Sequence, residues 1–408
     1  MRPIVWVTAF LLFLPVAGCL PKEDDTEPPA PAPAPVVFES AADAVLHMGA
    51  GWNLGNTLDS HSGELSHMWI EAWSPRTPKD YETAWGQPQA TRALIHMFKE
   101  AGFGAIRIPV TWYPHIGTIT LHDTDKWDPA SWTGTEVDAA WMARVKEVVD
   151  YVIDEGMYCI LNVHHDTGAS DTAWLVAGEA GFETAQTRYQ ALWQQIAMTF
   201  QDYGEKLLFE SYNEMLDAYD SWCFASFATP ARYDAAVAAS AYKGINQYAR
   251  LFVETVRATG GNNAIRNLII NTYGACSGDG TWNTHLKDPL LQLQLPESPG
   301  HIAVEVHSYW ESEKFDTQKA DIDRLFSNVS QHLQNRLGVP VIIGEWGGGT
   351  SADSDANVRF ASYFSSKAKA NGVAAFMWMG LSDGKDRAAP QWTMPRTKDA
   401  ILQAYAPK

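Results

Sequence analysis

The sequence predicts an α/β protein with a (β/α)8 TIM barrel, and three observations support this prediction. Eight short apolar segments recur from about residue 40 onward, as expected for parallel strands that are covered on both faces. Amphipathic helical patterns lie between most of these segments. Polar or aromatic side chains end seven of the eight, and this is where such barrels carry their functional groups.

The predicted strands are 51–56, 105–110, 157–164, 207–214, 267–274, 302–309, 339–347 and 373–380. A doubly wound open sheet is the alternative arrangement of alternating strands and helices. Such a sheet usually carries a glycine-rich phosphate turn after its first strand, and the sequence NLGNTLDS is not one. The closed barrel is therefore favoured.

Two helices between these strands have clear patterns. Residues 89–102 place Leu94, Met97 and Phe98 on one face, and Gly102 follows as a stop signal. Residues 138–156 form a second amphipathic stretch. The connection between the fifth and sixth strands is rich in glycine, proline and leucine, so we expect it to be the least helical.

The N-terminal residues predict export, not folded structure. Residues 1–19 have a positive start, an apolar run and small residues directly before Cys19, which resemble a lipoprotein signal peptide with its lipobox. Cys19 would then carry a lipid that anchors the chain to a membrane; a plain signal peptide or a short anchor is the alternative. We expect an exported bacterial lipoprotein at the outer membrane or cell surface, with its domain facing periplasm or medium.

An acidic and then Pro/Ala-rich linker is predicted over residues 20–37, because such a segment cannot bury enough apolar surface to fold. Residues 38–408 would form a single barrel domain. Cys159 lies in an apolar strand and is expected in the core. Cys223 and Cys276 fall in predicted loops, where a disulfide between them is one of two open alternatives.

Composition excludes some partners. The net charge is −18, from 30 Lys+Arg against 48 Asp+Glu, and no basic cluster stands out, which argues against nucleic acid. The 17 Trp, 15 Tyr and 16 Phe residues suit either core packing or stacking on sugar rings. The candidate sugar platforms are Trp69, Trp73, Trp85, Trp112, Trp222 and Trp310.

Functional side chains collect at the predicted C-terminal ends of the strands. In chain order these are Asn53, Arg107, His164, His165, Asn213, Glu214, His307, Tyr309, Glu345 and Trp378. In a closed barrel the ends of parallel strands form one rim, so these groups would surround one site.

Glu214 and Glu345 would face each other across that rim. Two carboxyl groups about 5 Å apart, one protonated and one ionised, are what a retaining glycosidase requires. Arg107 and Tyr309 would hydrogen-bond to the ionised carboxylate. The alternative is a buried ion pair that only stabilises the barrel.

The histidines do not predict a metal site. His164 and His165 are adjacent on a strand, so we expect their side chains to point to opposite faces. No third ligand with suitable spacing completes a zinc set. We therefore predict that no metal and no other cofactor takes part in the reaction.

Seven segments occur in order and together resemble glycoside hydrolase family 5, the cellulase A family: GWNLGNTLD, RIPVTW, LNVHHD, the Asn-Glu pair of FESYNE, VHSYW, IIGEWG and the tryptophan of the eighth strand. The resemblance extends from about residue 45 to 380. It implies that Glu214 is the general acid/base, Glu345 the nucleophile and Asn213 the partner of the 2-hydroxyl group. It also implies that Arg107 and Tyr309 hold the nucleophile, that His164 and His307 line the same subsite, and that Trp378 is its platform.

The expected activity is that of a retaining endo-β-1,4-glycanase acting on a β-linked polysaccharide, with endo-β-1,4-glucanase as the first expectation. Xyloglucanase, mannanase and xylanase are the alternatives within the family. A non-catalytic glycan-binding surface lipoprotein is the alternative of another class, although such a binder needs neither carboxylate. A barrel enzyme with a phosphate site at Gly347–Gly349 is disfavoured, because no Lys or Arg lies beside these glycines. We expect a monomer.

Overall fold

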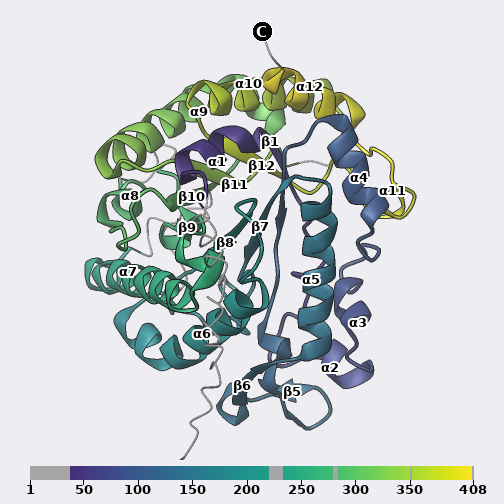
Figure 1. Ribbon diagram of the computed structural model, residues 1–408, viewed down its shortest axis with the longest axis vertical. Coiled ribbons are helices and arrows are strands. Elements are labelled where there is room, and N and C mark those ends of the chain that lie inside the picture. The colour runs from purple at the N-terminus through teal and green to yellow at the C-terminus, as the bar shows by residue number, and fades with distance from the viewer. Residues whose placement is uncertain (1–36, 220–232, 279–283, 350–351, 407–408) are drawn as a thin grey trace, which may run out of the picture. The chain divides into compact units, whose positions relative to one another are not determined.

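Eight parallel strands close into a barrel in the computed structural model, which describes residues 37–219, 233–278, 284–349 and 352–406 (Figure 1). The prediction of a (β/α)8 barrel is thereby confirmed. Each strand pairs with the strands that precede and follow it in the barrel sequence, and the last strand pairs with the first. The barrel strands are β1 (Ala50–Asn53), β2 (Ala105–Ile108), β7 (Tyr158–Asn162), β8 (Leu207–Glu210), β9 (Leu268–Asn271), β10 (Ile302–Tyr309), β11 (Val341–Gly347) and β12 (Ala374–Trp378).

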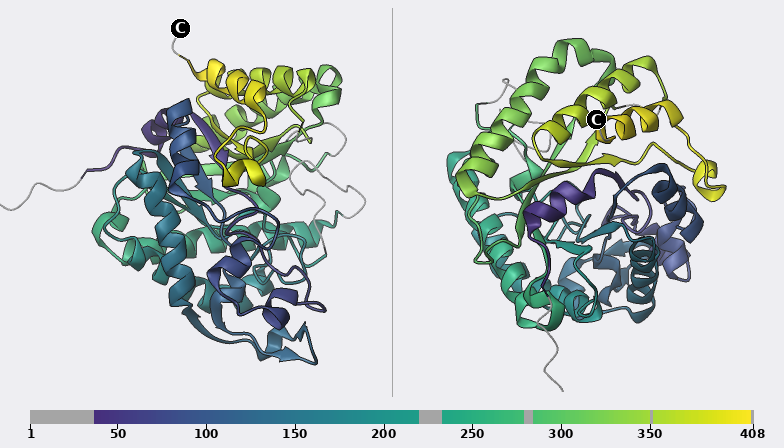
Figure 2. Two further views of the ribbon diagram at one scale, coloured as in Figure 1. Left: turned by 90° about the vertical axis from the view of Figure 1, so that its right-hand side faces the viewer. Right: turned by 45° about the horizontal axis from the view of Figure 1, so that its top comes forward.

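Helices surround the barrel (Figures 1 and 2). The longer ones are α4 (Arg92–Ala101), α5 (Ala139–Asp154), α6 (Glu179–Thr199), α7 (Ala235–Ala258), α9 (Phe315–Val329), α10 (Asp355–Ala370) and α12 (Pro395–Tyr405). Shorter elements are α2 (Trp69–Trp73), α3 (Pro78–Glu82), α8 (Asp288–Gln292), α11 (Lys385–Ala388) and two antiparallel pairs, β3 (Ile116–Thr118) with β6 (Thr133–Val137) and β4 (Leu121–His122) with β5 (Lys126–Trp127). In the part of the chain that the structure describes, no helix has the length and apolar character of a membrane span.

The two predicted helices are confirmed as α4 and α5. The Thr91 side chain caps the start of α4, and Gly102 ends it with a φ of 107°, which glycine adopts without strain. Asp138 caps α5 by accepting from the backbone N–H of Trp141. Between β9 and β10 the described residues contain a short 3-10 turn (Tyr273–Ala275) and, as their one α-helix, the five-residue α8, as expected from the composition of that connection.

The interior of the barrel has an apolar layer below a polar layer. Helix α1 (Ala41–Met48) packs against the apolar layer and closes the N-terminal end (Figure 2, right). The apolar layer contains Ala105, Ile160, Leu208, Ile269 and Ala303, all of them buried. Because side chains alternate along a strand, the residues two positions later also face inward. On these five strands they are Arg107, Asn162, Glu210, Asn271 and Glu305, all fully buried.

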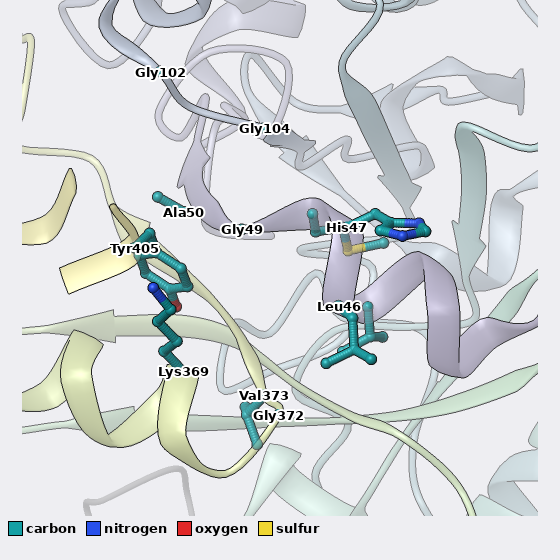
Figure 3. Close-up of a pocket in the computed structure, with 12 residues that line it drawn as sticks. Leu46, His47, Gly49, Ala50, Gly102, Gly104, Lys369, Gly372, Val373 and Tyr405 are labelled. Carbon is teal, nitrogen blue, oxygen red and sulfur yellow. The ribbon is translucent and has the colours of Figure 1, made fainter. Parts of the chain in front are cut away.

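A hollow of about 450 Å³ lies at the N-terminal end of the strands, the end opposite to the polar layer (Figure 3). Gly49 and Gly104, which precede β1 and β2, line it together with Lys369 and Tyr405. Lys369 is already engaged, because its Nζ donates to the backbone oxygen of Ala406 at 2.9 Å. The groups predicted for function all lie at the other end.

The cysteines behave in part as expected. Cys159 is buried and free, in agreement with its assignment to the core. Cys276 is buried and disulfide-bonded. Cys223, its suggested partner, lies outside the described residues, so the pairing stays a prediction.

Candidate active site

Arg107 lies at the centre of the polar layer, on β2, and is fully buried. Its Nε and Nη2 atoms donate to the two carboxylate oxygens of Glu210 at 2.7 and 2.8 Å. The other N–H groups donate to Asn53 at 3.0 Å, to Glu345 at 2.9 Å and to Asn213 at 2.8 Å. All five guanidinium donors are used, so one rigid fork fixes the positions of four side chains.

The two asparagines have different tasks. The Asn53 amide nitrogen donates to the backbone oxygen of Gly344 at 2.8 Å, which ties β1 to the strand that carries Glu345. The Asn213 side-chain oxygen accepts from Arg107, whereas its amide nitrogen makes no hydrogen bond with the described residues. Asn213 therefore has an N–H group with which it can bind a ligand.

Glu345 projects from β11 where the register with its neighbours shifts. One carboxylate oxygen accepts from Arg107, and the other accepts from the hydroxyl group of Tyr309. Burial and the Glu345 charge hold the pKa of Tyr309 well above its ordinary value, so the phenol keeps the proton that it donates. Two strong donors thus hold the carboxylate in a fixed orientation, as a nucleophile requires.

Glu214 lies in the loop after β8, four residues beyond the end of the strand, and one of its oxygens is 2.7 Å from Nδ1 of His307. Burial raises the pKa of Glu214; the hydrogen bond to His307 opposes this effect, and the Glu345 charge adds to it. Glu214 therefore retains its proton to a higher pH than a carboxyl group in water. This property suits a general acid.

The two carboxyl groups are close together. One oxygen of Glu214 and one of Glu345 lie within 4.8 Å of each other, and Nδ1 of His307 is 2.7 Å from Glu214 and 3.6 Å from Glu345. Retaining glycosidases place their carboxyl groups about 5 Å apart, whereas inverting enzymes need a wider gap for a water molecule. The geometry therefore fits attack by a carboxylate.

His164 lies beside this pair as a neutral ring. Asn162 fixes its tautomer: the asparagine oxygen accepts from the backbone N–H of Val110, and its nitrogen donates to Nδ1 of His164 at 3.1 Å. The His164 proton is therefore on Nε2, which is 3.8 Å from an oxygen of Glu345. Burial holds the pKa of His164 well below its ordinary value, so the ring is uncharged.

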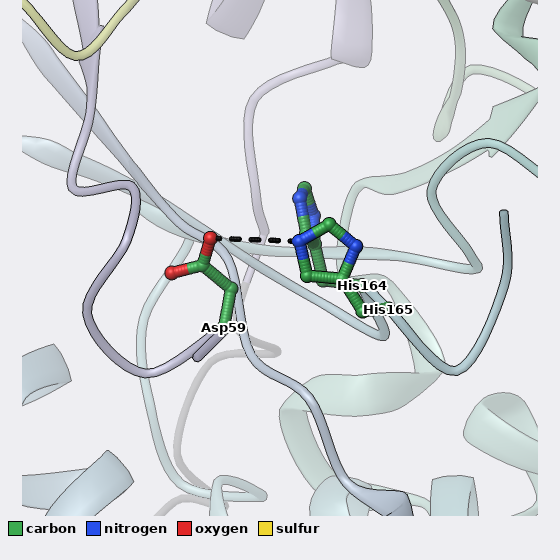
Figure 4. A group of neighbouring side chains, drawn as sticks. All are labelled: Asp59, His164 and His165. Atoms are coloured by element: carbon green, nitrogen blue, oxygen red, sulfur yellow. Dashed lines mark ion pairs between the residues drawn. The ribbon is translucent and has the colours of Figure 1, made fainter. Parts of the chain in front are cut away.

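His165 is the more exposed of the two histidines and lies next to Asp59 (Figure 4). The expectation that His164 and His165 point to opposite faces is wrong. Strand β7 ends at Asn162, so both histidines lie in the following turn, and their rings meet edge to face at 4.4 Å. Burial lowers the pKa of His165 well below its ordinary value.

Among the residues that the structure describes, two sets of three side chains have the composition of a metal site. They are Asp59, His164 and His165, and Glu214, His307 and Glu345. The oxygens of Asp59 already accept from two backbone N–H groups, and Nδ1 of His164 accepts from Asn162. The Asp59 oxygens and Nδ1 of His164 are thus engaged in hydrogen bonds within the chain. The absence of a catalytic metal stays a prediction.

Trp378 provides an aromatic face at the same rim. Its ring is parallel to that of His164, with 5.6 Å between centroids and 3° between planes. It also lines a hollow of about 190 Å³ together with Tyr309. Gly55 makes room for the ring, because a Cβ at that position would lie 2.8 Å from it. The position suits a platform for one sugar ring.

The tryptophans that were predicted as candidate sugar platforms differ in their burial. Trp112 and Trp310 are buried, and their N–H groups bond to Asn162 and Ser308, so they are packing residues and not platforms. Trp85 is partly exposed and lies 5.3 Å from the His165 ring, which makes it a candidate contact for a longer ligand. Trp69 is partly buried, Trp73 is exposed, and Trp222 lies outside the described residues.

Three polar residues of the site were missing from the prediction. Glu210 and Asn162 are the last residues of β8 and β7, Glu305 lies inside β10, and all three are fully buried. A charged residue inside an apolar strand is rarely buried without a partner, so the segments LLFE and VEV contained a usable signal. Glu210 accepts two hydrogen bonds from Arg107. The Asn162 side chain also donates to Glu210, at 3.1 Å.

A family model described as cellulase (glycosyl hydrolase family 5) matches residues 71–383. The chain belongs to glycosyl hydrolase family 5. Endoglucanase B of Neocallimastix patriciarum is 33% identical over 83% of this chain and 64% of the relative. Cellulase/esterase CelE of Acetivibrio thermocellus is 32% identical over 83% of this chain and 36% of the relative. The chain thus spans less than two thirds of these relatives.

Solved structures of family 5 enzymes have the same fold. A GH5-4 broad specificity endoglucanase from an uncultured bacterium is 47% identical, with a TM-score of 0.80 over 90% of this chain and 96% of that one. A family 5 enzyme from Prevotella bryantii, solved in complex with a xyloglucan tetradecasaccharide, is 36% identical, with a TM-score of 0.74 over 91% of this chain and all of that one.

Proposed function

We propose that this family 5 chain is a retaining endo-β-1,4-glucanase in which Glu345 is the nucleophile and Glu214 the general acid/base. The observation that supports this most strongly is the carboxyl pair: one oxygen of each group lies within 4.8 Å of the other, yet the surroundings of the two groups differ. Arg107 and Tyr309 donate to Glu345, while burial raises the pKa of Glu214.

In the first step, a Glu345 oxygen bonds to the anomeric carbon as the glycosidic C–O bond breaks. Glu214 gives its proton to the departing oxygen, so the leaving chain departs as an alcohol. Asn213 would hydrogen-bond to the 2-hydroxyl group, and Trp378 would lie under the sugar ring. His164 would donate from Nε2 to the same sugar.

In the second step, Glu214 acts as a base. It takes a proton from water, the hydroxide bonds to the anomeric carbon, and the bond to Glu345 breaks. Glu214 regains its proton and Glu345 its charge, so both residues return to their starting states. Two inversions at the same carbon give net retention.

The substrate class is a β-1,4-linked glucan. Relatives and structural neighbours of this chain are named endoglucanases, and one neighbour holds a xyloglucan oligosaccharide. Xyloglucan has a β-1,4-glucan backbone, so the plain and the branched chain present the same glycosidic linkage to the carboxyl pair. We therefore place β-glucan first and xyloglucan second, ahead of mannan and xylan.

The test is the release of reducing ends from β-glucan, xyloglucan, mannan and xylan by the wild type, Glu214→Gln and Glu345→Gln. We expect release from the glucans, a loss of about 10²–10⁴-fold in Glu214→Gln, and a loss at least as large in Glu345→Gln. Wild-type turnover in Glu345→Gln would contradict the mechanism. Binding of a glycan without release by the wild type would make the chain a capture protein.

We also propose that Cys19 anchors the chain as an exported lipoprotein, on the strength of the small residues before it and the linker that follows. Metabolic labelling with a fatty acid tests this. Label should enter the wild type and be absent from Cys19→Ser. Equal labelling of both would contradict a lipid on Cys19.

A further inference from the structure

Glu305 is a buried carboxyl group to which the mechanism above gives no task. It lies in the middle of β10 between two apolar residues and is fully buried. One oxygen, Oε1, is 3.2 Å from Nε2 of His307 and 3.3 Å from Nε of Arg107. Among the described residues, the other oxygen has no hydrogen-bond partner. The contacts of this carboxyl group are therefore directed at two residues of the active site.

His307 has a carboxyl oxygen at each ring nitrogen. Nδ1 faces Glu214 at 2.7 Å, and Nε2 faces Glu305 at 3.2 Å. A neutral imidazole has only one N–H group and cannot donate to both sides. If both carboxyl oxygens act as acceptors, His307 must be an imidazolium ion.

The charged groups around His307 support the imidazolium form. Burial opposes the charge, but the carboxylates of Glu345, Glu214 and Glu305 prevail and raise the pKa of His307 to about 10. The Glu345 carboxylate is 3.6 Å from Nδ1. Other ionisable groups near these side chains are Arg107, His164, Glu210 and Tyr309.

We propose that Glu305 is a positioning residue: it is the counter-ion that keeps His307 positively charged, so that Nδ1 always donates to Glu214. This rests on the proposed role of Glu214 as the acid. An imidazolium can only donate, so the oxygen of Glu214 that faces it must accept. The acid proton is then confined to the other oxygen of Glu214, from which it passes to the leaving group. A neutral ring with a lone pair on Nδ1 would instead bind that proton itself.

The neighbouring strand makes room for this carboxyl group. A Cβ at Gly344 would lie 1.8 Å from Oε1 of Glu305, so no larger residue fits beside it. The Gly344 carbonyl group is held in turn by Asn53. The strand that carries Glu345 is thus shaped around Glu305.

The ion pair between Glu305 and His307 is lost at low pH, when Glu305 is protonated. Burial and the charge of Glu210 raise the pKa of Glu305 to about 7, against the opposing charges of Arg107 and His307. Glu305 is ionised above this value and loses its charge below it. The charged Glu305–His307 pair is therefore present from about neutral pH to about pH 10.

Histidine NMR tests the proposal without any activity measurement. The protein, which has 12 histidines, is labelled with ¹³C at histidine Cε1, and the His307 signal is identified by its loss in His307→Gln. We expect wild-type His307 to remain charged at neutral pH and to titrate near pH 10. In Glu305→Gln, which keeps the side-chain volume, the midpoint should fall by about 1–3 pH units. Glu305→Asp, which restores the charge, should recover much of the shift.

Glu82→Gln is the matched control. Glu82 is also fully buried, but it pairs with Arg144 and does not face His307. Its removal should leave the His307 titration unchanged. The proposal would be overturned if wild-type His307 is neutral at pH 7, a result that needs no variant. An unchanged midpoint in Glu305→Gln, or an equal shift in Glu82→Gln, would overturn it as well.

Kinetics with two leaving groups tests the consequence for the acid. Phenyl β-cellobioside needs protonation of its leaving group, whereas 2,4-dinitrophenyl β-cellobioside does not. In Glu305→Gln we expect kcat/KM to fall about 10–100-fold for the phenyl substrate and less than about twofold for the other. Equal losses would assign Glu305 a merely structural role. If Glu214→Gln abolishes reducing-end release but Glu305→Gln shows none of these effects, this proposal fails while the proposed function stands.

Discussion

Two buried arginines at opposite ends of the barrel show how the same side chain can bind either carboxylates or backbone carbonyl groups. Arg107 lies on β2 near the rim that carries Glu214 and Glu345, and Arg266 lies just before β9 at the N-terminal end. Each makes five hydrogen bonds. Those of Arg107 go to two carboxylates and two asparagines. Those of Arg266 go to four backbone carbonyl groups and the side chain of Asn263.

The difference is in the charge of the acceptors. Burial tends to lower the pKa of both guanidinium groups, but Glu210, Glu305 and Glu345 more than reverse this for Arg107 and raise its pKa well above the ordinary value. Arg266 has no carboxylate partner among the described residues, and burial with Arg257 nearby lowers its pKa to about 9. Carbonyl groups hold Arg266 as a structural clamp. Carboxylates make Arg107 part of an electrostatic network that includes Glu345, the proposed nucleophile.

The largest expected effect is on catalysis by Arg107→Lys. Lysine keeps the charge but cannot reproduce the five-donor fork, so Glu345 and Asn213 lose fixed partners. We expect kcat to fall about 10²–10³-fold on β-glucan. The matched variant Arg266→Lys should retain kcat within about twofold at a temperature where it is folded. Similar kcat losses in the two variants would remove the distinction between the two arginines.

The next effect is on stability, from Arg266→Met. The four backbone carbonyl groups that accept from Arg266 would lose a buried donor, and each unsatisfied carbonyl group costs about 1–3 kcal/mol of stability. Some will find water, so we expect the free energy of unfolding to fall by about 3 kcal/mol or more. Denaturant unfolding measures this change. A loss below about 1 kcal/mol would show that the clamp is dispensable.

A smaller effect is expected from Tyr309→Phe, which removes one hydrogen bond to Glu345 and leaves those of Arg107 intact. A hydrogen bond to a charged group contributes about 1.5–3 kcal/mol, which corresponds to about 10–100-fold in kcat. The measurement is kcat on β-glucan, with thermal unfolding as the control for folding. A loss equal to that of Arg107→Lys would contradict the central place of Arg107.

The smallest effect concerns pH. The Glu345 charge contributes to the raised pKa of Glu214, so Glu345→Gln should lower the pKa of Glu214 relative to the wild type. Titration of ¹³C-labelled glutamate carboxyl groups by NMR measures the direction, with the Glu214 signal identified from Glu214→Gln. The five hydrogen bonds of Arg266 go to carbonyl groups and none goes to Glu214 or Glu345, so Arg266→Lys should leave this titration unchanged. A higher pKa of Glu214 in Glu345→Gln would contradict the coupling.

The sequence was sufficient to predict the barrel, because every strand is a short apolar run and the chain pairs its strands in order. It also predicted that Glu214, Glu345 and Arg107 lie at one rim, since each is at or near a strand end. The structure brings these side chains together, and their catalytic roles stay a prediction. It did not locate Glu210 or Glu305. The local sequence can mark them as buried charges, but their partners depend on which strands face each other inside the closed barrel.

Side-chain positions in turns and the burial of tryptophans were also not predictable from the sequence. The relation of His164 to His165 was predicted from strand alternation, but the strand ends two residues earlier, at Asn162. The tryptophans could not be sorted from composition, because Trp112 and Trp85 differ only in what packs around them. Side-chain periodicity applies within an element and fails as soon as the element ends.

The most direct test of the account is the configuration of the sugar end that the enzyme releases, followed by ¹H NMR during the first minutes of cello-oligosaccharide hydrolysis. Carboxyl oxygens within 4.8 Å of each other predict that the β-anomer appears first and that the α-anomer forms later by mutarotation. An α-anomer that appears first would show inversion. It would contradict the assignment of Glu345 as a nucleophile held by Arg107.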